Sequence, residues 1–229
     1  MESTIGYDNL ATFYDAFIDQ KVYDSYLDLL DKYTVRGTLL DIGCGTGNLS
    51  VELAARGYEV TATDLAEEML SIVRYRANER GVPLRIYLYD MLDPIAERFD
   101  AVIASMDVIN HLSDLEDVNF GFMNIYDALN ENGVFIFDIL SAEYIDALDG
   151  YSEEDEDFHF HWRCDRGKTL HSIVHTVTLH LPDGEREVRI YEETHPLEEY
   201  LAIASRVGFT VLERVDMPER SIVVLQKSK

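Results

Sequence analysis

Two kinds of hydrophobic pattern alternate along the middle of the chain. Short, nearly continuous apolar runs are typical of strands that are covered on both faces of a sheet. Between these runs, apolar residues recur every three or four positions, which is the spacing of one face of a helix. The regular exchange from residue 38 to residue 140 predicts an α/β fold with a doubly wound, mostly parallel sheet. The predicted strands of this region are residues 38–42, 58–64, 84–90, 99–107 and 133–140.

The helices between these strands have recognisable ends. Gly57 and Gly81 follow two of the predicted helices, and glycine is the usual residue just after a helix C-terminus. Ser113 and Glu116 have the spacing of a capping box, and they are predicted to begin a helix that runs toward Gly133. Further upstream, the apolar spacing predicts two short helices within residues 8–33.

The pattern changes after residue 149. Residues 151–157 are strongly acidic and are predicted to be poorly structured. Three segments of alternating polarity follow, and they predict about three antiparallel strands inserted at residues 150–194. These segments are residues 158–164, 170–181 and 187–195. A helix that Gly208 closes and two further strands, at residues 209–216 and 221–227, complete one predicted domain over residues 1–229.

The charge balance restricts the partners. The 229 residues carry 44 acidic and 19 basic side chains, a formal net charge of −25. Such a field repels phosphate backbones, so nucleic acid is not expected as a substrate, and cationic or neutral small molecules are favoured. Solubility alone would also explain the acidity. The chain has no long apolar run and no basic start, and Cys44 and Cys164 lie far apart, so we expect a cytoplasmic protein without disulfides or a membrane partner.

A glycine-rich turn follows the first predicted strand. Gly43 and Gly45 fit the dinucleotide fingerprint, but the third glycine, Gly47, comes one residue early. Asp41 precedes the turn, and its charge would oppose a pyrophosphate. A ligand with an ammonium or sulfonium group fits a nearby carboxylate better. Asp64 ends the second predicted strand, where a carboxylate can accept both hydroxyls of a ribose, and Asp90 ends the third, where an adenine edge would lie.

These residues resemble the first motif and the acidic ribose loop of S-adenosylmethionine-dependent methyltransferases with a seven-stranded, Rossmann-like fold. The antiparallel insert and the leading segment, residues 1–36, resemble the small-molecule branch that acts on amino sugars or glycine, in which such a segment lies over the cofactor. One departure is Ala66, where the family often has a serine that caps the next helix. The resemblance implies S-adenosylmethionine as cofactor, with contacts from Tyr14, Asp41, Gly43, Cys44, Gly45, Gly47, Asp64, Leu65, Asp90, Met91, Ser105 and Met106.

The segment after the fourth predicted strand is expected to border the methyl acceptor. Base-directed and glutamine-directed methyltransferases commonly have an Asn/Asp-Pro-Pro-Tyr tetrapeptide there, whereas this chain has Ser105–Val108 without a proline. Asn110 and His111 are candidate substrate residues. An amine acceptor must arrive neutral, so a side chain must take its proton, and Tyr14, Asp107 and His111 are the candidates.

Six of the seven histidines lie at positions 159–195, but no matching set of acidic or thiol ligands accompanies them, and we predict no metal site. A hairpin that pairs Cys164 with Lys168 would place His161 opposite His171. Three alternatives to a small-molecule methyltransferase stay open: a regulatory protein that binds the cofactor without turnover, a nicotinamide-dependent oxidoreductase, and a methyltransferase that acts on a protein or another macromolecule. The half-apolar insert strands could also serve a homodimer.

Overall fold

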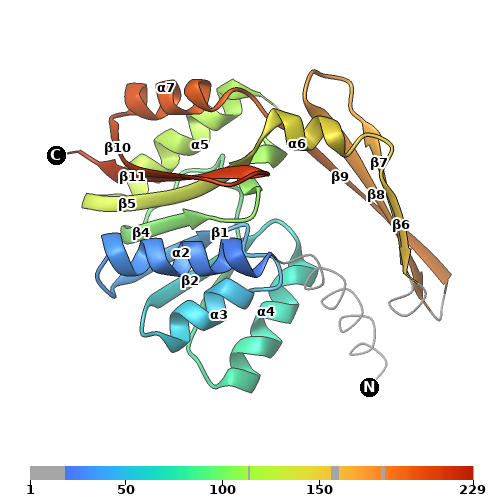
Figure 1. Ribbon diagram of the computed structural model, residues 1–229. Coiled ribbons are helices and arrows are strands. Elements are labelled where there is room, and N and C mark those ends of the chain that lie inside the picture. The colour runs from blue at the N-terminus through green and yellow to red at the C-terminus, as the bar shows by residue number, and fades with distance from the viewer. Residues whose placement is uncertain (1–18, 113, 156–159, 182–183, 229) are drawn as a thin grey trace.

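The computed structural model describes residues 19–112, 114–155, 160–181 and 184–228 (Figure 1). Seven strands form one sheet in the order β10-β11-β5-β4-β1-β2-β3. The neighbours from β5 to β3 are parallel, while β11 pairs antiparallel with both β5 and β10. The strands are β1 (Thr38–Ile42), β2 (Glu59–Asp64), β3 (Arg85–Leu88), β4 (Phe99–Ala104), β5 (Leu129–Leu140), β10 (Phe209–Asp216) and β11 (Arg220–Lys227).

Helices cover both faces of this sheet, which confirms the predicted doubly wound fold (Figure 1). One hydrophobic core lies between the sheet and the pair α5 and α7, and a second lies between the sheet and the pair α2 and α3. This double cover is the physical reason for the apolar runs, because each strand buries side chains on both faces. The helices are α2 (Gln20–Tyr33), α3 (Asn48–Ala55), α4 (Glu67–Arg80), α5 (Leu115–Ala128) and α7 (Leu197–Val207), with a 3₁₀ turn, η1 (Val108–His111).

A second, separate sheet of four antiparallel strands extends beyond the end of β5 (Figure 1). The helix α6 (Ala142–Ala147) leads into it. Met69 and Ile72 of α4 pack against Phe160 and Val177 of this second sheet, which seats the insert next to the carboxyl ends of the parallel strands. The four strands are β6 (Ser152–Asp155), β7 (Phe160–Arg166), β8 (Ser172–Leu181) and β9 (Gly184–Glu193).

Several details of the insert correct the sequence-based expectation. The acidic segment predicted to be poorly structured contains β6, which pairs with β7 and gives the insert four strands rather than three. The hairpin register is also different, since His161 lies opposite Thr178 and Cys164 lies opposite His175. The turn between β7 and β8 is longer than a tight hairpin. The short helix α6 was not predicted.

Some strand ends in the parallel sheet also differ from the predicted ones. β3 ends at Leu88 rather than at residue 90, and β4 ends at Ala104 rather than at residue 107. The helix α5 is capped by Asp114, whose carboxylate accepts hydrogen bonds from the backbone N–H groups of Glu116 and Asp117. Ser113, the predicted cap, lies outside the described residues, as do Tyr14 and the first of the two predicted N-terminal helices. No described helix is both long and apolar enough to span a bilayer.

Candidate active site

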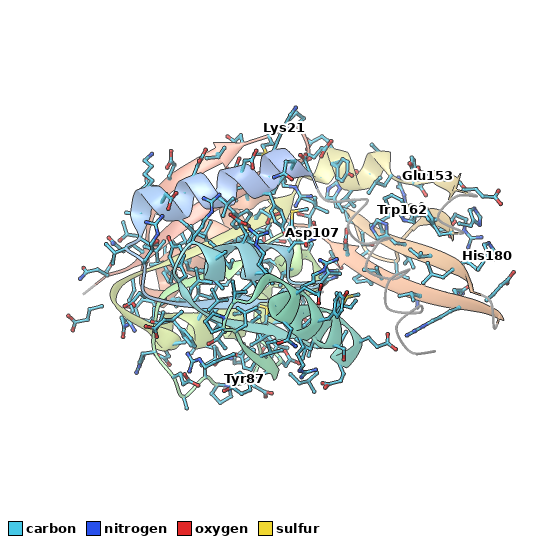
Figure 2. All side chains as sticks on the ribbon, turned by 90° about the horizontal axis from the view of Figure 1, so that it is seen from below. Lys21, Tyr87, Asp107, Glu153, Trp162 and His180 are labelled. Atoms are coloured by element: carbon cyan, nitrogen blue, oxygen red, sulfur yellow. The ribbon has the colours of Figure 1, made fainter. Side chains whose placement is uncertain are left out.

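A cavity of about 680 Å³ lies between the carboxyl ends of the parallel strands and the inner face of the insert. One wall comes from the glycine turn and the ends of β2 and β4, and the opposite wall comes from β7, β8 and β9. Figure 2 shows Asp107 on the side of the parallel domain that faces the insert, with Trp162 on the insert itself. The carboxyl edge is where open α/β sheets bind their ligands.

The glycine turn forms the floor of one end of the cavity. Gly43 has a φ of +67°, and a Cβ atom there would lie 2.5 Å from Cγ2 of Val108, so a larger residue would push the turn away from η1. Gly45 has a φ of +53°, and among the described residues no atom outside Gly45 and its two chain neighbours lies within 4 Å of the place of its absent Cβ. Its backbone can therefore approach a ligand closely. Gly47 precedes α3 and does not line the cavity.

Asp41 lies beneath the turn rather than in the cavity wall. Its side chain is 1% exposed, and Oδ2 accepts a hydrogen bond from the hydroxyl of Ser50. The other oxygen, Oδ1, accepts no hydrogen bond from the part of the chain that the structure describes. Burial, opposed by the Ser50 hydrogen bond and assisted by the charge of Asp64, raises the pKa of Asp41 from 3.8 to about 7. The ionised form of Asp41 is therefore unfavourable in the folded protein, and a nearby cation would stabilise it.

Replacing Asp41 with asparagine is expected to raise the free energy of unfolding at pH 8 by about 2 kcal/mol. Between about pH 4 and pH 7 the folded state keeps a proton on Asp41 that the unfolded chain has released. Stability from this group therefore falls as the pH rises through that window and stays low above it. Urea unfolding at pH 5 and pH 8 measures the effect, and Asp28→Asn, on the exposed face of α2, serves as the control. Equal pH profiles for Asp41→Asn and the unmodified protein would contradict this assignment.

Two acidic residues predicted for the nucleoside do line the cavity. Oδ2 of Asp64 accepts a hydrogen bond of 2.9 Å from the Gly45 N–H, and Oδ1 accepts one of 2.8 Å from the Ala66 N–H. Asp90 lies two residues beyond the end of β3, and its Oδ1 accepts a hydrogen bond from the Leu92 N–H. Leu65 and the residues Cys44, Met91, Ser105 and Met106 also line the cavity.

The segment after β4 has a backbone shape that non-glycine residues seldom adopt. Met106 and Asp107 have φ values of +63° and +61°. The carboxylate of Asp138, a fully buried residue of β5, holds both in place by accepting hydrogen bonds from the Met106 N–H at 2.7 Å and the Asp107 N–H at 3.1 Å. Arg220 donates to Asp138 and, at 3.0 Å, to Asp107. This network points Asp107 into the cavity.

The two predicted substrate residues have different surroundings. His111 lines the cavity, and its Nδ1 lies 3.2 Å from the carbonyl oxygen of Tyr191. A carbonyl oxygen only accepts, so Nδ1 carries the hydrogen and the neutral ring has its lone pair on Nε2. Asn110 is fully buried away from the cavity, where it donates to the Glu193 carbonyl and accepts from the Leu140 N–H. Asn110 therefore holds the insert against β5.

The insert contributes cavity residues that the sequence reasoning missed. On β8 and β9, His175 and Val177, and then Ile190 and Glu192, lie two positions apart and so share one face. The alternation of these residues along the strands could have predicted that one face of the insert lines the cavity. No sequence pattern indicated that Arg220 lines it as well. The remaining lining residues outside the prediction include Tyr23, Tyr89, Tyr144 and Trp162.

Hydrogen bonds fix the orientation of His175 and Glu192. The indole N–H of Trp162 lies 3.1 Å from Nδ1 of His175, and Nε2 of His175 lies 3.1 Å from Oε2 of Glu192. Burial lowers the pKa of His175, but its hydrogen bonds with Cys164 and Glu192 outweigh burial and raise the pKa to about 10. Two groups meet Nδ1: the indole N–H of Trp162, which needs a lone pair there, and Sγ of Cys164 at 3.2 Å, which can accept a hydrogen from it. Whether the ring is neutral or protonated, its Nε2–H donates to Glu192.

The fold and the position of the cavity define a class: an α/β protein of Rossmann-like architecture with a ligand cavity at the carboxyl edge of its sheet. Residues 39–133 match a family model described as a methyltransferase domain. The chain is 30% identical over 243 residues to "Putative methyltransferase YqeM" of Bacillus subtilis (strain 168), with 97% of this chain and 98% of that one covered.

Two solved structures have the same fold. An S-adenosylmethionine-dependent methyltransferase from Clostridium acetobutylicum superimposes with a TM-score of 0.85 at 24% identity, covering 97% of this chain and 99% of that one. The amino pentose methyltransferase CalS10 of Micromonospora echinaspora, solved with S-adenosylmethionine bound, has a TM-score of 0.70 at 21% identity over 95% of both chains. The chain belongs to the S-adenosylmethionine-dependent methyltransferases of Rossmann-like fold.

Proposed function

We propose that this protein binds S-adenosylmethionine at the glycine-turn end of the cavity and transfers its methyl group to a small molecule held at the insert end. The observation that carries the proposal is the two-sided cavity, with the glycine turn and Asp64 on one wall and the insert strands on the other. The cofactor supplies an electrophilic methyl group on a sulfonium. Asp41 Oδ1, which is buried and without a hydrogen-bond partner among the described residues, suits a cationic ligand near the Gly45 backbone.

In this proposal each residue of the glycine-turn end contacts or supports a different part of the cofactor. Asp64 accepts the ribose hydroxyls, and Asp90 with Met91 borders the base. Gly43, Cys44 and Gly45 give backbone access, while Asp41 and Gly47 support the turn from behind. Alignment of donor and acceptor contributes about 7–11 kcal/mol in well-oriented reactions, so holding both partners is the main task. Tyr14, outside the described residues, keeps its proposed role in covering the cofactor.

The acceptor end contains the groups that can act on the acceptor. Burial, and then the nearby charge of Glu192, raises the pKa of Asp107 to about 7. His111 presents an Nε2 lone pair, so either side chain can take a proton or bind a cation. Trp162, Val177 and Ile190 give the same end an apolar wall. An acceptor with an apolar body and one amine or hydroxyl fits this mixture. CalS10, which shares the fold, is an amino pentose methyltransferase, and this kinship supports a small-molecule acceptor.

The direct test has two stages. Calorimetry should show one S-adenosylhomocysteine molecule bound per chain, with NADH giving no heat. Incubation with S-adenosylmethionine and a panel of small amines and hydroxyl compounds should then release S-adenosylhomocysteine with at least one of them. Preferred binding of NADH would overturn the cofactor assignment. Tight cofactor binding, with turnover only on protein substrates, would overturn the small-molecule acceptor.

A further inference from the structure

Three side chains that can bind a metal ion meet at the acceptor end of the cavity. Asp107, His111 and Glu192 each offer one ligand atom, and these atoms all lie within 4.8 Å of one another. Ligand atoms around one tetrahedral ion with bonds of about 2.1 Å lie about 3.4 Å apart. The three groups would therefore approach one another by at most about 1.4 Å to share one ion. Asp107 and His111 come from the segment after β4, and Glu192 comes from β9 of the insert.

Each of these side chains is also held by a second group from outside the cluster. Arg220 donates to Oδ1 of Asp107 at 3.0 Å, and His175 donates to Oε2 of Glu192 at 3.1 Å. His111 donates its Nδ1–H to the Tyr191 carbonyl, which leaves the Nε2 lone pair for an ion. Metal-binding histidines almost always donate their other ring N–H in this way, and outer partners of this kind orient carboxylate ligands. These outer contacts hold the three ligand side chains in fixed orientations.

The local charge independently favours a cation. Asp107, Asp138 and Glu192 bring three carboxylates, while the hydrogen bonds that the described residues make to them bring one guanidinium, that of Arg220. The side chains of Asp138 and Glu192 are 0% and 9% exposed, which limits screening by water. A bound cation would offset the excess of carboxylate groups at this end of the cavity.

We propose that Asp107, His111 and Glu192 bind one divalent cation. One imidazole and two carboxylates suit Mn²⁺, Fe²⁺ or Zn²⁺. The open side of the cluster faces the cavity, so an oxygen of the acceptor would complete the coordination. This last step rests on the proposed function, whereas the ion site does not. In this arrangement His111 would be a metal ligand, and the cation would lower the pKa of a bound hydroxyl so that its proton could pass to water without a protein base.

Titration of Mn²⁺ into chelator-treated protein, followed by loss of the free-ion electron paramagnetic resonance signal, tests the site directly. We expect one ion per chain, and we expect His111→Ala and Glu192→Gln each to weaken binding at least tenfold. His171→Ala is the matched control, because His171 pairs with Asp146 at 2.9 Å outside the cavity and its loss should leave binding unchanged. Circular dichroism and S-adenosylhomocysteine binding identify any variant that has not folded.

The results of ion binding and of S-adenosylhomocysteine binding test the metal site and the proposed function separately. Absence of stoichiometric Mn²⁺ and Zn²⁺ binding by protein that binds S-adenosylhomocysteine normally would overturn the metal site alone. Equal ion affinity in the unmodified protein and in folded Glu192→Gln would also overturn it, since the ion would lie elsewhere. Ion binding by protein that fails to bind S-adenosylhomocysteine would support the site and overturn the proposed cofactor.

Discussion

Replacing Asp138 with alanine is expected to lower the free energy of unfolding by about 3–5 kcal/mol. The Asp138 carboxylate is fully buried and accepts hydrogen bonds from the Tyr26 hydroxyl, two backbone N–H groups and Arg220. Its removal leaves the guanidinium, which is 9% exposed, with Asp107 as its remaining carboxylate partner. It also releases the left-handed backbone at Met106 and Asp107, so the cavity loses its shape together with its stability. Urea unfolding measures the loss.

A surface ion pair provides the control for this prediction. Asp165 and Arg163 lie 2.8 Å apart with both side chains more than half exposed, and Asp165→Ala should cost less than about 1 kcal/mol. A double substitution tests the mechanism: adding Arg220→Met to Asp138→Ala should cost less than the sum of the two single changes, because the buried charge is then gone. Additive costs, or a loss below about 1 kcal/mol for Asp138→Ala, would show that the network is not a buried, coupled unit.

Replacing Asp64 with alanine is expected to weaken S-adenosylhomocysteine binding about 100-fold, which corresponds to roughly 2.7 kcal/mol. In the proposed complex the carboxylate accepts the ribose hydroxyls, and hydrogen bonds to a charged group contribute about 1.5–3 kcal/mol. The same carboxylate accepts hydrogen bonds from the Gly45 and Ala66 N–H groups, so its loss also loosens the glycine turn. Isothermal titration calorimetry measures the affinity directly.

The control for Asp64 removes the same charge three residues away. The side chain of Glu67 is 67% exposed and pairs with Arg74 at 3.4 Å, and Glu67→Ala should change the affinity less than about twofold. An equal loss in both variants would mean that the general negative field, rather than the position of Asp64, attracts the ligand. An unchanged affinity in folded Asp64→Ala would place the ribose elsewhere.

Elements that depend on neighbouring residues were predictable from the sequence, whereas those that depend on distant contacts were not. The strand ending at Asp64 and the helix ending before Gly81 follow from neighbouring residues, and the structure has both at the predicted positions. The strand β6 itself consists largely of acids whose composition indicates a loop, and pairing with β7 overrides that composition. The predicted register between β7 and β8 was wrong for a similar reason. Contacts across the insert, rather than the turn residues, fix this register.

The sequence by itself determined the order of strands and helices in the parallel domain, the glycine turn and the acids after the strands, since periodicity, turn chemistry and chain direction are local properties. Only the tertiary structure decided which acids face the cavity. Asp41 and Asn110 are buried outside its wall, while Glu192 and Arg220 join Asp107 from segments far away in the chain. Whether a charged group lies beneath a wall or within it depends on packing between distant segments, and no short stretch of sequence records that packing.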